Sequence, residues 1–61
     1  MRFLRLKQVI EITGLSRSNI YRSITEDQFP PSVSISERSV AWVESEIEEW
    51  VMKKIEARDG V

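Results

Sequence analysis

Side chains with apolar surface recur at helical spacing near the start of the chain, at Leu6, Val9, Ile10 and Thr13. Separations of three and four residues place these side chains on one face of a helix, which predicts a short amphipathic helix over residues 6–13. Gly14 follows at once, and glycine adopts the left-handed conformation that ends a helix without a steric penalty. The first helix is therefore expected to end at Thr13.

A second helix is predicted over residues 17–26, after a minimal turn. Ser16 can accept a hydrogen bond from an unpaired N–H group of its first turn, which is the role of an N-cap. Leu15 precedes this cap and can pack on Ile20 as a hydrophobic staple, which fixes the angle at which the chain enters the helix. Ile20 and Ile24 lie one turn apart and are expected to face the core. Two helices that cross over so short a turn are typical of a helix-turn-helix.

The helical pattern stops at Phe29-Pro30-Pro31, because proline lacks a backbone N–H and favours extended conformations before it. Alternating positions then flank Ser36-Glu37-Arg38-Ser39, which predicts a β-hairpin over residues 33–42. The side chains expected to share its inner face are Val33, Ile35, Val40 and Trp42. A hairpin that follows a helix-turn-helix resembles the wing of a winged helix, with Arg38 at its tip.

A third helix is predicted over residues 44–56, where one apolar stripe contains Ile47, Trp50, Val51 and Ile55. This helix is expected to cover the core as a lid. Its acidic residues come early and its lysines late, which suits the helix dipole, and Glu49 and Lys53 have the spacing of an ion pair. Residues 57–61 carry no periodic apolar signal and are expected to fray. The predicted fold is a mainly α winged helix-turn-helix in the order helix, helix, hairpin, helix.

Length and composition limit the functions open to this chain. Its 61 residues are expected to form one small domain, in which the two tryptophans carry much of the core. The chain has no cysteine and no histidine, which argues against disulfides, zinc fingers and histidine-dependent catalysis. The adjacent Glu48 and Glu49 have no nucleophile beside them in the pattern. We therefore expect no enzyme activity, metal, cofactor or small-molecule ligand. No segment has the apolar length of a membrane span or signal peptide, which predicts a cytoplasmic protein.

Charge is distributed unevenly along the chain, although the net charge is only −1. Residues 1–25 contain five arginines or lysines against one glutamate, a net charge of +4. Residues 26–43 carry −2, and residues 44–61 carry −3. The first part can face a phosphate backbone, whereas the remainder is expected to face mostly away from it.

The second helix offers side chains suited to DNA on its outward face. Arginine donates in a fork to guanine edges or phosphates, asparagine pairs with adenine, and serine and tyrosine hydroxyls suit phosphate oxygens. The candidate DNA-binding residues are Ser16, Arg17, Ser18, Asn19, Tyr21 and Arg22, with Arg38 from the wing. Of these, Asn19 is expected to lie between the buried and outward faces. Glu37 beside Arg38 would be repelled by DNA, which weighs against insertion of the wing.

Most of the chain resembles the AlpA family of small phage-type DNA-binding regulators. The resemblance is carried by residues 5–9, by Thr13-Gly14-Leu15-Ser16-Arg17-Ser18-Asn19-Ile20-Tyr21-Arg22, by Phe29-Pro30, and by residues 42–50. It implies a winged helix-turn-helix like those of MerR-type regulators and excisionases, and DNA binding near a promoter or recombination site without enzyme activity. Three positions depart from the family pattern. Asn19 replaces a usual threonine, Ser36 a common glycine, and Glu37 a neutral or basic residue.

Three functions follow from these observations. The first is a sequence-specific transcriptional regulator of a prophage or integrative element that reads the major groove with the second helix. The second is an excisionase that binds and bends attachment-site DNA. The third is a protein-interaction module, such as an antitoxin, that uses Trp50 and Met52 as an exposed patch. The expected partners are double-stranded DNA and, beyond it, an integrase or further copies of the chain. No heptad pattern marks a dimer interface, so a free monomer is expected.

Overall fold

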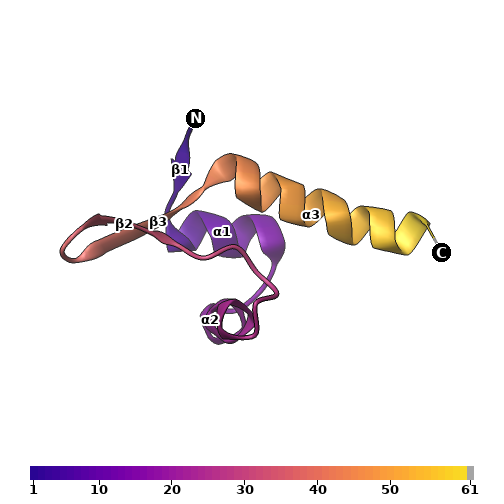
Figure 1. The fold of residues 1–61 in the computed structure, drawn as a ribbon, viewed down its shortest axis with the longest axis horizontal. Helices are drawn as coiled ribbons and strands as arrows, with labels where there is room; N and C mark the ends of the chain where they lie inside the picture. The colour runs from indigo at the N-terminus through magenta and orange to yellow at the C-terminus, as the bar shows by residue number, and fades with distance from the viewer. Residues whose placement is uncertain (61) are drawn as a thin grey trace.

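The computed structural model describes residues 1–60, which form three helices and a small antiparallel sheet (Figure 1). The elements are β1 (Phe3–Leu4), α1 (Leu6–Thr13), α2 (Arg17–Thr25), β2 (Val33–Ser36), β3 (Ser39–Val43) and α3 (Glu44–Asp59). The predicted order helix, helix, hairpin, helix is confirmed. Strand β1 was not predicted, because two residues are too few to show an alternating pattern, and it is formed by pairing with β3.

The turn between α1 and α2 has the predicted construction. Gly14 has φ 74°, and its N–H donates to the carbonyl oxygen of Ile10 at 2.8 Å. The hydroxyl of Thr13 accepts a hydrogen bond from the N–H of Leu15 at 3.2 Å, which braces the turn. The hydroxyl of Ser16 accepts from the N–H of Asn19 at 3.2 Å and caps α2. Helix α2 ends at Thr25, one residue before the predicted end.

The core joins all parts of the fold around Trp42. Its buried cluster consists of Leu4, Val9, Ile20, Phe29, Trp42 and Ile47. Trp42 is fully buried, and its indole N–H donates to the carbonyl oxygen of Pro30 at 3.1 Å. Trp50 is only partly buried, and its indole N–H donates to the carbonyl oxygen of Gln28 at 2.9 Å. The two tryptophans therefore fasten the loop that joins α2 to β2 and contains both prolines.

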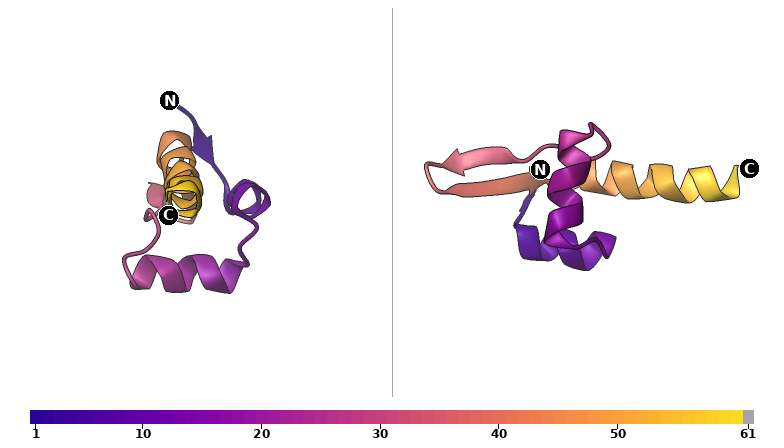
Figure 2. Two further views of the ribbon diagram at one scale, coloured as in Figure 1. Left: turned by 90° about the vertical axis from the view of Figure 1, so that its right-hand side faces the viewer. Right: turned by 90° about the horizontal axis from the view of Figure 1, so that it is seen from below.

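The three strands lie in the order β1-β3-β2, with β3 antiparallel to both neighbours. The predicted inner face of the hairpin is wrong for three of its four residues, because Val33, Ile35 and Val40 are 38–48% exposed. Figures 1 and 2 show the reason: the β2–β3 hairpin extends away from the helices, so no other element within residues 1–60 covers its outer part. Only the last part of β3 reaches the core, where Ala41 and Trp42 are buried.

Helix α3 begins as the predicted lid and then extends past the core (Figure 1). Ile47 is buried, Val51 is half-buried, and Ile55 is 38% exposed. The helix continues to Asp59, so the expectation of a frayed tail is wrong for residues 57–59, while Val61 lies outside the described residues. The predicted ion pair is present, with Lys53 Nζ 3.5 Å from Glu49 Oε1. None of the helices within residues 1–60 is long and apolar enough to cross a membrane.

Candidate nucleic-acid interface

Helix α2 projects from the body of the molecule as a separate element. It is seen end-on below α1 in Figure 1, and from below it runs across the front of the fold in Figure 2. Ile20 is completely buried and Ile24 packs against the core, which leaves the opposite face to solvent. Ser16, Arg17, Ser18, Tyr21 and Arg22 are exposed, and Asn19 is half-buried between the two faces, as predicted. Six of the seven candidate residues are thus presented together by one helix and its cap.

The two arginines of α2 contact neutral partners. Arg22 Nη2 donates a hydrogen bond to Asn19 Oδ1 at 2.9 Å. The Arg17 guanidinium lies 5.9 Å from the centre of the Tyr21 ring, in the geometry of a cation–π contact. Because neither partner is an acid, both contacts orient a guanidinium without cancelling its charge. These contacts were not predicted from the sequence, although the spacings of three and four residues are the ones that bring helical side chains together.

Tyr21 also ties this exposed face to the core. Its ring packs edge-on against Trp42, with 6.3 Å between ring centres and 60° between ring planes. The Tyr21 side chain is still 39% exposed. Thr25, one turn later, donates its hydroxyl to the Tyr21 carbonyl oxygen at 3.1 Å. The same tyrosine therefore supports Arg17 on one side and rests on the most buried aromatic residue on the other.

The wing carries the seventh candidate residue. Glu37 and Arg38 form the turn between β2 and β3, and both are exposed. The pairing of the two strands shifts in register between Ser34 and Ser36, and the Ser34 hydroxyl donates to the Ser36 carbonyl oxygen at 3.2 Å. Figures 1 and 2 show the tip at one end of the long axis, away from α2. The structure therefore does not bring Arg38 beside the residues of α2.

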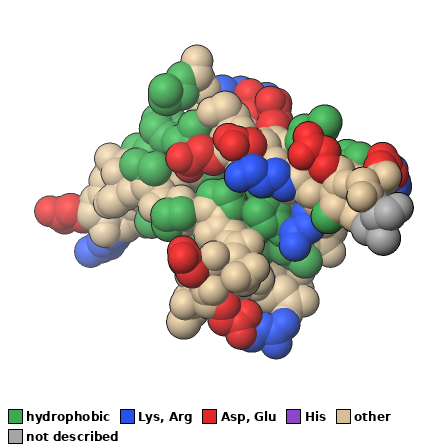
Figure 3. All heavy atoms as spheres, turned by 45° about the vertical axis from the view of Figure 1, so that its right-hand side comes forward, with side chains coloured by type: hydrophobic (Ala, Val, Ile, Leu, Met, Phe, Trp, Pro, Cys, Tyr) green, Lys and Arg blue, Asp and Glu red, His purple; other side chains and the backbone are tan. Residues whose placement is uncertain are grey.

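Three basic side chains outside α2 have acidic partners. Arg2 Nη1 lies 3.0 Å from Glu44 Oε2. This ion pair neutralises one of the five positive charges counted in residues 1–25. On α3, Lys53 pairs with Glu49, and Arg58 Nε lies 2.7 Å from Asp59 Oδ1. Figure 3 shows acidic and basic groups lying close together over much of one face. Both arginines of α2 thus have neutral partners, whereas on α3, which carries more acidic than basic residues, two of the three basic residues are paired with acids.

Comparisons with known proteins agree with the resemblance carried by the sequence pattern. Residues 2–55 match the family described as prophage CP4-57 regulatory protein (AlpA). The chain is 46% identical over 57 residues to an uncharacterized protein of Enterobacteria phage P4, a match that covers 93% of this chain and 65% of the phage protein. It is 35% identical over 60 residues to the DNA-binding transcriptional activator AlpA of Escherichia coli K12, covering 88% and 86% of the two chains. The chain thus spans about two thirds of the length of the phage P4 relative.

Proposed function

We propose, because the chain belongs to the AlpA family of prophage regulatory proteins, that it is a sequence-specific DNA-binding transcriptional regulator of a prophage or integrative element. The observation that carries the proposal is the exposed face of α2. There two guanidinium groups are held by neutral partners, on a helix whose opposite face is fixed to the core. A projecting helix with this chemistry is suited to the major groove.

Base reading is assigned to Arg22 and Asn19. A guanidinium can donate in a fork to guanine, and an asparagine amide can pair with adenine. The hydrogen bond between the two side chains holds the guanidinium in a defined direction before DNA arrives, so less side-chain freedom is lost on binding. Asn19, where the family usually has threonine, gives this chain a base preference of its own in the proposal.

Phosphate contacts are assigned to the remaining residues of this face. Ser16 and Ser18 lie at the exposed start of α2, where hydroxyl and backbone N–H groups suit a phosphate oxygen. Arg17 contributes charge, and the Tyr21 hydroxyl contributes a donor. Arg38 at the tip of the wing contacts a phosphate or the minor groove on one side of the α2 site. These contacts set the position of α2 on the duplex, while sequence is read by the base contacts.

The proposal includes the setting in which the chain acts. Its partner is double-stranded DNA, it works in the cytoplasm where phage and bacterial DNA lie, and it involves no catalytic step. An excisionase would use the same α2 surface at attachment sites, so the location of the bound sites distinguishes regulation of transcription from recombination. Sites within promoters support the first role, and sites confined to attachment regions, with bending of the DNA, support the second.

The test is selection of fragments of host and phage genomic DNA by the purified chain, followed by footprinting of the recovered fragments. We expect one recurring motif, protected by the wild type and lost with Arg22→Ala. The matched control is Arg58→Ala, which removes an arginine from α3 and is expected to leave the footprint intact. Recovery of fragments without a common motif, or equal footprints for wild type and Arg22→Ala, would contradict the proposal.

A further inference from the structure

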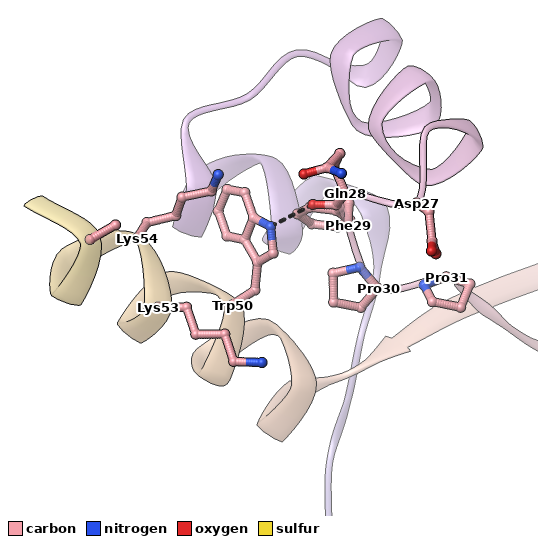
Figure 4. A pocket seen from close by; sticks show the side chains of 9 residues that line it. Asp27, Gln28, Phe29, Pro30, Pro31, Trp50, Lys53 and Lys54 are labelled. Carbon is pink, nitrogen blue, oxygen red and sulfur yellow. Dashed lines mark hydrogen bonds between the residues drawn. The ribbon is translucent and has the colours of Figure 1, made fainter.

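An open groove of about 530 Å³ lies beside Trp50, between α3 and the loop that follows α2 (Figure 4). Its apolar wall includes Phe29, Pro30, Pro31 and Trp50, and the rings of Phe29 and Trp50 pack edge to face with 4.9 Å between centres. Lys53 and Lys54 line it from α3, and Lys54 Nζ lies 5.3 Å from the centre of the Trp50 ring. Asp27 also lines the groove, and Lys53 is paired with Glu49, so Lys54 is the groove lysine without an acidic partner among the described residues. The α2 site does not use this groove.

The opposite end of the molecule has the complementary character. The wing tip presents the exposed carboxylate of Glu37, and Ile35, two residues earlier, is 48% exposed. Contact with DNA accounts for Arg38 and leaves these two side chains without a role, since a carboxylate is repelled by phosphates and an exposed isoleucine gains nothing from them. Viewed from below, the wing and α3 extend in opposite directions from α2 (Figure 2).

We propose that the wing tip of one copy docks into the Trp50 groove of the next copy when several copies bind side by side on DNA. Glu37 meets the ammonium group of Lys54, and Ile35 is covered by the apolar wall of the groove. The contact joins two different surfaces, so it repeats head to tail and gives an open array in place of a closed dimer. The inference rests on the proposed function, because α2 sets the orientation of each copy on the duplex.

The length of the molecule allows such an array. Its long axis measures 43 Å, and the wing and α3 extend in opposite directions along that axis (Figure 1). One turn of DNA measures about 34–36 Å. Two copies that lie along the duplex one turn apart, on the same face, therefore overlap at their ends, with the wing of one copy beside α3 of the next.

The test compares binding to one selected site with binding to two tandem copies of that site. Duplexes carry the two copies with centres about 10 bp apart, one helical turn, or about 15 bp apart, which places the second copy on the opposite face. The measured quantity is the ratio of second-site to first-site affinity, which is independent of single-site strength. The variants are Glu37→Lys, Lys54→Glu and the double variant, with Glu48→Lys as a matched charge reversal outside the wing and the groove.

At the one-turn spacing, we expect the wild type to bind the second site about tenfold more tightly than the first. At the spacing of about 15 bp, we expect equal affinities for the two sites. Glu37→Lys and Lys54→Glu should each abolish the enhancement, the double variant should restore it by exchanging the charges, and Glu48→Lys should retain it. Independent binding by the wild type, or enhancement that survives both single reversals, overturns the inference and leaves the proposed function intact. Absence of binding even to a single site overturns the proposed function and the inference together.

A second measurement detects the contact directly. Because the natural chain has no cysteine, Glu37→Cys and Lys54→Cys each introduce a unique thiol. On a two-site duplex, a short bismaleimide should join the two variants only when they are mixed, whereas Glu48→Cys should not join to Glu37→Cys. Linkage of Lys54→Cys copies to one another would show that two grooves face each other in a symmetric contact. No linkage of Lys54→Cys to either variant would show that no second copy occupies the groove. Either result overturns the head-to-tail contact.

Discussion

Helices α2 and α3 treat their basic side chains in opposite ways. On α2, Arg17 and Arg22 contact a tyrosine ring and an amide oxygen, so each guanidinium keeps its charge. On α3, Lys53 and Arg58 pair with Glu49 and Asp59. Exposed pairs of the second kind contribute at most about 1 kcal/mol to stability, but they do cancel charge locally. The number of basic residues is similar on the two helices, but acids of the same helix cancel part of that charge on α3, where only Lys54 has a neutral partner, the Trp50 ring.

The two helices also differ in how much of their length the core supports. Helix α2 has nine residues and is held to the core by Ile20, which is buried, and by Ile24, which packs against the core. Helix α3 has 16 residues and projects past the core in its second half, where ion pairs and the dipole-matched order of charges favour the helix without tertiary packing. A rigid reading surface is therefore expected at α2, and a protruding surface for other contacts at α3.

Removal of Trp42 is expected to have the largest effect, because this residue supports both helices at once. Its ring contacts Tyr21 of α2 and belongs to the buried cluster with Ile47 of α3. Trp42→Ala should lower the free energy of unfolding by about 3–5 kcal/mol, which is enough to unfold so small a domain. Circular dichroism during thermal and urea unfolding measures the change. A folded variant with unchanged melting would contradict the assignment of Trp42 as the common support.

Arg22→Ala is expected to lower the affinity for DNA without lowering the stability of the fold. The side chain is exposed and bonded only to Asn19 among the described residues, so its loss should leave thermal melting nearly unchanged. A lost base contact is expected to weaken specific binding by about 1–3 kcal/mol, which is about 5- to 150-fold in affinity. Fluorescence anisotropy with the selected duplex measures this loss. Arg58→Ala is the control on α3, and an equal loss for both variants would remove the distinction between the helices.

The salt dependence of binding sharpens the comparison further. Each phosphate contact contributes about 0.9 to the slope of log affinity against log salt concentration. Arg17→Gln on α2 should reduce that slope by about 1 for specific and random duplexes alike, whereas Lys53→Gln on α3 should leave it unchanged. Titrations at several salt concentrations give both slopes. A smaller slope for Lys53→Gln would show that α3 also contacts the phosphate backbone.

The sequence predicted best those features that depend on neighbouring residues. The C-terminal end of α1 and the start of α2 follow from Gly14 and Ser16, and each performs the predicted capping role. The outward face of α2 follows in the same way from the helical period, given the buried Ile20. Local rules suffice here because the turn, the cap and the exposed face are all set within a few residues.

Features that depend on distant parts of the chain were missed or misjudged. Alternation along the hairpin distinguishes its two faces but does not show whether another element packs on either face. Ile35 was therefore wrongly assigned to the core. A charge count by segment treated Arg2 as available, although its partner Glu44 lies 42 residues further along the chain. The residues proposed to read DNA were found from the sequence, whereas the partners that orient them became evident only in the structure.

The smallest expected effects concern the two helix ends that use a left-handed residue. Asp27 has φ 60° after α2, where its N–H bonds to Ile24 and the N–H of Gln28 bonds to Ser23, the pattern of a Schellman motif. A left-handed aspartate is strained, so Asp27→Gly should stabilise the fold by a few tenths to about 1 kcal/mol. At Gly14, with φ 74°, an added methyl group has free space around it. Gly14→Ala should therefore lower the free energy of unfolding by about 1 kcal/mol through backbone strain alone. Urea unfolding that gave both changes the same sign would show that backbone conformation does not govern these ends.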